Sequence, residues 1–145
     1  MTRTQSITGS DYEALAEFRY QIRKFLHFSE TAAREASIEP HQHQLLLAIR
    51  GLNGPGEPPS IGILAERLQI QHHSAVELMD RLVERGLVAR SRDPSDRRQV
   101  LIHLTPRGES ELEKLTAYHL AELRTNGPAL VKALEAVVRR NHDGE

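Results

Sequence analysis

The chain has 145 residues, a formal net charge of −1, no cysteine and 4% aromatic residues. Its length fits one domain, and the lack of cysteine excludes disulfides, thiolate metal sites and thiol-based redox sensing within it. No apolar run is long enough to cross a bilayer, and the first residues lack the apolar stretch of a signal peptide. We therefore expect a cytoplasmic protein without a membrane partner.

The first predicted element is a long helix. Residues 1–9 are expected to be a flexible lead-in, after which Ser10 can act as the N-cap and Glu13 as its capping-box partner. Apolar residues then recur at helical spacing as far as Phe28, and the pattern can continue to Glu35. All three phenylalanines of the chain lie in this helix, which we expect to carry the main helix–helix contact.

Two shorter helices follow, separated by a loop. Pro40 is a good first-turn residue for a helix that ends at Gly51. The segment 53–59 is rich in glycine and proline and predicts a loop. Ser60 can then cap a short third helix that ends near Leu68.

The middle of the chain predicts a helix-turn-helix followed by a β-hairpin. A brief break at 69–71 leads into a fourth helix that ends at Gly86. The segment 90–105 then predicts two short strands joined by a turn at 93–96, where Pro94 fixes φ and both aspartates can bond the local backbone.

The second strand of this hairpin has a period-2 pattern. Val100, Ile102 and Leu104 alternate with Leu101 and His103, which lets one face be buried. The hairpin therefore has an inner face against the helices and a tip exposed to solvent.

The last third of the chain is helical. A fifth helix begins at Thr105 or Pro106, and Asn126–Pro128 predicts a break before a sixth helix that frays from Asn141 onward. Five or six helices with one hairpin in this order predict a mainly α fold with a small β-hairpin wing, a winged helix-turn-helix.

Positive charge gathers at the hairpin although the whole chain is near neutral. From Arg85 to Arg98 there are five arginines and two aspartates, a net charge of +3. A thin basic ribbon suits the narrow minor groove of DNA, where negative potential attracts arginine. A solvated arginine-rich surface is the alternative reading.

The fourth helix is amphipathic, and its polar side can read DNA. In helix-turn-helix geometry the second helix enters the major groove with its N-terminus first. Histidine can donate to guanine or phosphate, whereas Glu77 can accept from cytosine N4 but repels phosphate. The candidate major-groove residues are Gln71, His72, His73, Ser74 and Glu77.

The wing supplies a second group of candidates. Asp96 can pair with an arginine and hold its side chain in one orientation, which reduces the conformational entropy lost on binding. Arg98 is the candidate for insertion into the minor groove, and Arg97 for groove or phosphate contact. Candidate contacts to the DNA backbone are Ser60, Arg81, Arg90 and Arg92. A structural salt-bridge cluster would explain the same arginines without DNA, above all Arg90.

Three segments together resemble the MarR family of bacterial transcriptional regulators. The segment 93–108 is similar to the wing signature of that family, 78–88 to the end of its recognition helix, and 40–46 to the opening of its second helix. The resemblance covers roughly residues 10–140 in element order.

The resemblance implies a homodimer that binds a pseudo-palindromic double-stranded operator. Residues 10–36 and 105–140 would form the dimerisation region and 37–104 the DNA-binding lobe, with flexible ends at 1–9 and 141–145. It implies repression relieved by a small molecule, often an aromatic acid, and a cytoplasmic protein that joins the nucleoid when bound to DNA. Asp96 and Arg98 would be the salt-bridge and minor-groove residues of the wing.

Two features depart from the family pattern. Val76 and Glu77 stand where many relatives carry basic or hydroxyl residues that touch DNA, so the operator sequence cannot be transferred. The lack of cysteine excludes the thiol-sensing branches of the family, so another trigger is required.

The candidate ligand pocket lies where the first two helices should face the DNA-binding lobe. It comprises His27, Phe28, His41, His43, Leu46 and Arg50. Arg50 or a histidine could pair with a carboxylate. A core and dimer-interface role is the alternative for the aromatic residues.

Other functions have less support in the sequence. A metal-responsive regulator could use His27, Glu30, His41 or His43, but histidines at i and i+2 on a helix diverge, so we predict no metal site and no cofactor. A winged helix can also serve as a protein–protein interaction module. Catalysis is not expected, because the chain has no phosphate-binding loop and no nucleophile elbow.

Overall fold

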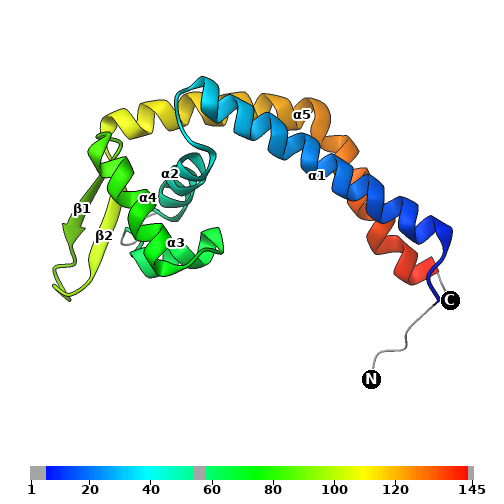
Figure 1. The fold of residues 1–145 in the computed structure, drawn as a ribbon, viewed down its shortest axis with the longest axis horizontal. Helices are drawn as coiled ribbons and strands as arrows, with labels where there is room; N and C mark the ends of the chain where they lie inside the picture. The colour runs from blue at the N-terminus through cyan, green and yellow to red at the C-terminus, as the bar shows by residue number, and fades with distance from the viewer. Residues whose placement is uncertain (1–5, 54–57, 144–145) are drawn as a thin grey trace. The chain divides into compact units, whose positions relative to one another are not determined.

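The structure is a computed structural model that describes residues 6–53 and 58–143. The described elements are α1 (Gly9–Glu35), α2 (Pro40–Leu52), α3 (Ile61–Leu68), α4 (His72–Glu84), β1 (Val88–Arg92), β2 (Val100–Leu104) and α5 (Pro106–Asp143) (Figure 1). The predicted mainly α fold with a hairpin wing is confirmed. The outer parts of the predicted flexible ends, 1–5 and 144–145, and most of the predicted loop, 54–57, lie outside the described residues.

The chain divides into two compact units. The first, here called the two-helix unit, comprises the chain up to Thr31 and from Tyr118 onward. The second, here called the winged unit, comprises Ala32–Ala117. The winged unit is thus larger than the predicted DNA-binding lobe, because it includes the end of α1 and the start of α5.

The core of the winged unit is built from α2, α3, α4 and the hairpin. Leu46, Leu82 and Ile102 each have 0% exposure, one from each of α2, α4 and β2. The two strands pair antiparallel, from Val88 opposite Leu104 at the base to Arg92 opposite Val100 near the tip. The base of the wing is therefore anchored in the core, while its tip extends away from it (Figure 1).

The burial pattern of β2 differs from the predicted alternation at one residue. Leu101, expected on the solvent face, is only 5% exposed. The cause is the segment before α3: Ser60 forms an isolated β-bridge with Leu101, and the Ile102 amide donates to the Pro59 carbonyl at 3.1 Å. This added backbone segment covers the second strand, and a period-2 pattern within one hairpin cannot reveal it.

The junction between α4 and α5 is closely packed. The Thr105 hydroxyl donates to the Gly86 carbonyl at 2.6 Å and accepts from the Gly108 amide at 3.0 Å. The Thr105 amide donates to the Leu87 carbonyl at 3.1 Å. A Cβ atom on Gly108 would lie 2.0 Å from that same oxygen, so only glycine fits there.

The N-terminus of α1 is not where the sequence placed it. The Thr8 hydroxyl accepts from the Asp11 amide at 3.3 Å, and the Asp11 carboxylate accepts from the Thr8 amide at 2.9 Å. This is a reciprocal capping arrangement with Thr8 as the cap residue. The predicted cap at Ser10 is wrong because Ser10 already lies inside the helix, which begins at Gly9.

The predicted break at Asn126–Pro128 is also wrong, since α5 continues through Pro128 to Asp143. A proline ring clashes with the Cβ of the preceding residue in a helix, but that residue is Gly127, which has no Cβ. The helix on the far side of Pro128 still buries Ala133, which is 5% exposed. Packing thus outweighs the hydrogen bond that the proline removes. Helix α5 extends two residues past Asn141, to Asp143, and the predicted flexibility of 141–145 stays a prediction.

The two-helix unit is held by an aromatic cluster. Phe28 stacks on Tyr118 with ring centroids 4.9 Å apart. The rings of Phe25 and Phe28 both make T-shaped contacts with the His119 ring, whose Nε2 lies 2.8 Å from the Ser29 hydroxyl. Phe25 and Phe28 thus take part in the contact between α1 and α5, as predicted. No helix in the described part of the chain is long and apolar enough to cross a membrane.

Candidate nucleic-acid interface

Helix α4 occupies the recognition position of the winged unit. Gln69, in the left-handed region at φ 54°, makes the turn that separates α3 from α4. Its side-chain amide donates to the Glu66 carbonyl at 2.8 Å and so closes the end of α3. The inner face of α4 buries Ala75, Met79 and Leu82, as its amphipathic pattern predicted.

The predicted major-groove residues share the other side of this helix or its first turn. Gln71 is the N-cap residue, Ser74 is half-buried, and the remaining candidates are exposed: His72, His73 and Glu77. Arg81, predicted to touch the DNA backbone, is exposed on the same helix. Ser60 is engaged locally, since its hydroxyl accepts from the Ile63 amide at 3.4 Å and caps α3 as predicted.

The tip of the wing is organised by two aspartates. The buried Asp93 carboxylate accepts from the Ser95 amide at 2.9 Å and from the Ser95 hydroxyl at 2.7 Å. The Asp96 carboxylate accepts from the Arg98 amide at 3.1 Å and pairs with the Arg98 guanidinium at 3.4 Å. The predicted pairing of Asp96 with an arginine is confirmed.

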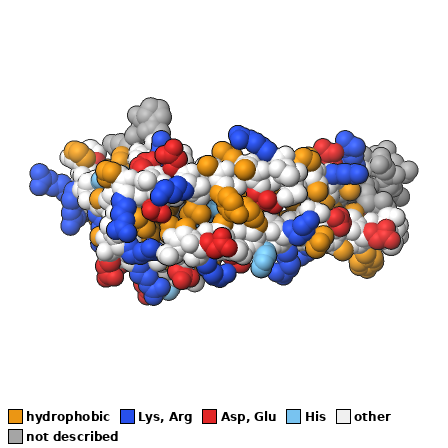
Figure 2. Space-filling model, turned by 90° about the horizontal axis from the view of Figure 1, so that it is seen from above, with side chains coloured by type: hydrophobic (Ala, Val, Ile, Leu, Met, Phe, Trp, Pro, Cys, Tyr) orange, Lys and Arg blue, Asp and Glu red, His pale blue; other side chains and the backbone are white. Residues whose placement is uncertain are grey.

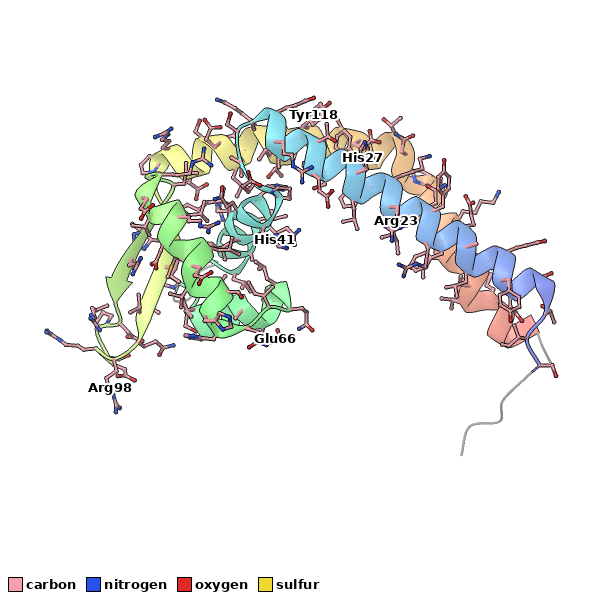
Figure 3. All side chains as sticks on the ribbon, in the orientation of Figure 1. Arg23, His27, His41, Glu66, Arg98 and Tyr118 are labelled. Atoms are coloured by element: carbon pink, nitrogen blue, oxygen red, sulfur yellow. The ribbon has the colours of Figure 1, made fainter. Side chains whose placement is uncertain are left out.

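Arg98 is almost fully exposed at the tip of the wing. Its side chain is 94% exposed although it is paired with Asp96. Figure 3 shows Arg98 pointing away from the tip of the hairpin, and Figure 2 shows a group of Lys and Arg side chains (blue) standing out at this end of the molecule. Arg97 is also exposed at the tip. The wing thus presents cations on a thin, locally ordered turn.

The two arginines of the first strand are used within the protein. Arg90 forms an ion pair with Asp80, which links β1 to α4. The Arg92 guanidinium donates to the Arg97 carbonyl at 2.8 Å and so braces the turn from within. These contacts fit the alternative reading, in which the arginines have a structural role, and the predicted contacts of Arg90 and Arg92 with the DNA backbone stay predictions.

The hydrogen bonds to Asp93 shift its titration. The Ser95 hydroxyl, the Ser95 amide and the Asp96 amide lower the pKa of Asp93 below its ordinary value of 3.8, against an opposing effect of burial. A carboxyl group whose pKa is lower in the folded than in the unfolded chain stabilises the fold at pH values above its unfolded pKa. This stabilisation is lost as the pH falls through the pKa of the folded state. The turn of the wing therefore depends on a charged Asp93.

We expect this dependence to appear in acid unfolding. The wild-type protein should lose stability as pH falls below about 3.8, and an Asp93→Asn variant should lose less over the same interval, because its side chain does not titrate. Thermal unfolding between pH 2 and pH 6 measures both. Parallel acid profiles for the two proteins would contradict the assignment.

The structure divides the predicted ligand-pocket residues between the two units. The exposed His27 and the half-buried Phe28 belong to the two-helix unit. The winged unit contains the exposed His41, the buried His43, Leu46 in the core, and Arg50, whose guanidinium pairs with Glu109 at 3.1 Å. Within residues 6–53 and 58–143, no group of three or more His, Asp or Glu side chains could hold a metal ion.

Two of the contacts that the sequence did not predict connect α4 to other elements. One is the Asp80–Arg90 pair, and the other joins Gln42 of α2 to Arg85 at the end of α4 at 3.1 Å. Gln42 is 6% exposed, and its side-chain oxygen also accepts from the Glu39 amide at 3.2 Å. No sequence spacing signals these contacts, because the partners are brought together by tertiary packing.

Comparisons with known proteins agree with this geometry. A profile of the MarR family matches residues 36–99. The HTH-type transcriptional regulator YsmB of Bacillus subtilis is 35% identical over 122 residues, which cover 81% of each chain. A putative transcriptional regulatory protein for the hcr operon of Thauera aromatica is 32% identical over 97 residues, which are 67% of this chain and 56% of the Thauera protein.

Solved structures show the same fold. The transcriptional repressor CouR bound to a 23-mer DNA duplex has a TM-score of 0.65 and 28% identity, over 94% of this chain and 100% of CouR. AbsC, a MarR-family transcriptional regulator from Streptomyces coelicolor, has a TM-score of 0.73 and 19% identity, over 97% of this chain and 99% of AbsC.

The fold and the exposed recognition helix and wing define a winged helix-turn-helix transcriptional regulator. The chain belongs to the MarR family. Members of this family are regulators of transcription and not enzymes. The predicted family, fold and regulatory class are therefore confirmed.

Proposed function

We propose that the protein is a homodimeric repressor that binds a pseudo-palindromic operator and is released by a small molecule. The observation that carries the DNA-binding part is the wing tip, where Asp96 holds the exposed Arg98 by both its backbone and its side chain. A cation fixed in this way loses less entropy on entering a minor groove. The major-groove contacts would come from the exposed N-terminal half of α4.

The proposed homodimer rests on the two-helix unit. Large apolar side chains are exposed on both of its helices, among them Tyr12, Leu15, Tyr20, Val131, Leu134 and Val138. Hydrophobic area of this extent marks an interaction surface in a soluble protein. A second copy of the chain would supply the matching face and bring two winged units to two half-sites.

The proposed effector is a small aromatic carboxylate. Tyr118 is 53% exposed while its ring stacks on Phe28, which leaves an aromatic surface available to a ligand. Arg50 is already paired with Glu109, so a histidine is the better candidate to meet the carboxylate. His27 is exposed on α1, and Figure 3 shows it with Tyr118 in the two-helix unit.

Four measurements on the purified protein test these statements. The purified protein should bind DNA from upstream of its own gene and protect two half-sites about one helical turn apart. Affinity should fall steeply with salt, because cations that contact phosphates release counterions. An aromatic carboxylate that suits the site should weaken the complex, and sedimentation should give a dimer.

The alternatives predict different results. A protein–protein interaction module would show no phosphate-driven salt dependence. A monomer in sedimentation would exclude the homodimer, and a complex that no aromatic carboxylate weakens would exclude that effector class.

A further inference from the structure

The recognition helix is acidic, which is unusual for an element that approaches a polyanion. Helix α4 carries three carboxylates, Glu77, Asp80 and Glu84, and one arginine, Arg81. Each carboxylate near a phosphate would weaken binding. Each carboxylate on this helix is therefore expected to have a role, either in the stability of the fold or in the recognition of DNA bases.

Two of the three carboxylates have another explanation. Asp80 is neutralised by its ion pair with Arg90 and joins the helix to the wing. Glu84 is the last residue of α4, far from the N-terminal end that enters a major groove. Glu77 stands in the N-terminal half of the helix and is exposed.

Among residues 6–53 and 58–143, no ion pair accounts for the charge of Glu77. Its neighbours one turn away are His73 and Arg81, yet the ion pairs found among the described residues do not include Glu77. A carboxylate interacts favourably with the helix dipole when it lies in the first turn. Glu77 is the sixth residue of α4 and therefore lies beyond that turn. The fold therefore gains little from this charge.

The major groove offers a carboxylate one well-matched partner. Cytosine presents its N4 amino group as a donor, and glutamate accepts from it. The adenine amino group lies beside the N7 acceptor, and guanine and thymine present acceptors, which repel a carboxylate. A carboxylate that is desolvated against any of these bases is left without a donor.

We propose that Glu77 determines operator specificity by requiring a cytosine at one position of each half-site. This inference rests on the proposed DNA-binding function and adds the base that the recognition helix selects. His73 and Arg81, the charged or titratable neighbours on the same face, supply donors to adjacent bases or phosphates. Because the site is repeated in a dimer, the cytosine appears at two symmetry-related positions.

Selection from a random DNA library tests the proposal. The wild-type protein should prefer cytosine at one symmetric pair of positions by about tenfold or more over the other bases. Glu77→Gln should move that preference to adenine, because a glutamine side chain pairs with adenine N6 and N7. Glu77→Ala should bind all four bases there with similar affinity.

Glu84→Gln is the matched control. It removes the same charge from the same side of the same helix, two turns further from the N-terminus. It should raise affinity for all sequences alike and keep the cytosine preference. Thermal unfolding should show that every variant is folded.

The outcomes distinguish the role of Glu77 from the DNA-binding function of the protein. If the wild type selects a defined site and both Glu77 variants select the same site with unchanged base preference, the role of Glu77 is overturned while the DNA-binding function stands. If the wild type enriches no sequence, the proposed function itself fails, and this inference fails with it.

Discussion

Replacing Gly108 with alanine is expected to lower the free energy of unfolding by about 3 kcal/mol, which is a fall in melting temperature of roughly 10 °C. The new Cβ would lie 2.0 Å from the Leu87 carbonyl oxygen, which is backbone and cannot rotate away. That oxygen already accepts from the Thr105 amide at 3.1 Å. Relief of the clash must therefore separate the start of α5 from the end of the recognition helix.

Gly62→Ala is the matched control for this prediction. Gly62 lies in α3, and a Cβ there meets no atom within 4 Å. The same chemical change should then be neutral or stabilise by about 0.5 kcal/mol, because alanine is the better helix former. Thermal and urea unfolding of both variants make the comparison. Equal stability of Gly108→Ala and the wild type would show that the close approach at this junction does not constrain the fold.

The same junction ties the end of the recognition helix to two other helices of the winged unit. The Arg107 guanidinium donates to the Arg85 carbonyl at 3.3 Å, and Arg85 in turn reaches Gln42 of α2. The end of the recognition helix is thus tied both to the first turn of α5 and to the first turn of α2.

The sequence was sufficient for features that depend on local chemistry. Ser60 capped α3, Pro40 began α2, and the turn at 93–96 formed around its aspartates, because each outcome is decided within four residues. The inner face of α4 followed from its spacing of apolar residues for the same reason. Such features need no knowledge of the tertiary fold.

The wrong or missing predictions concern features that depend on tertiary contacts. A Gly–Pro pair usually ends a helix. At Gly127–Pro128 the packing beyond the proline, at Ala133, keeps α5 continuous. Leu101 is buried by the segment at Pro59 and Ser60, about 40 residues earlier in the chain. The partners of Arg90 and Arg85 likewise depend on elements that meet only in the folded state.

Replacing Arg98 with alanine is expected to weaken operator binding by about tenfold or more at moderate salt. It should also reduce the slope of affinity against salt by about one ion, since one cation is lost from the interface. The Arg98 side chain is 94% exposed and is paired with Asp96, so helix content and oligomeric state should not change. Circular dichroism and sedimentation check that the loss is confined to DNA binding.

Two further variants decide how Arg98 acts. Arg139→Ala removes an arginine whose side chain is 73% exposed on α5, outside the winged unit, and should leave operator affinity nearly unchanged. Arg98→Lys keeps the charge but loses the planar guanidinium, so it should restore the salt slope and only part of the affinity. Full recovery with lysine would mean that residue 98 contacts phosphate alone. Unchanged affinity of Arg98→Ala at matched salt would show that Arg98 makes no contact with the operator.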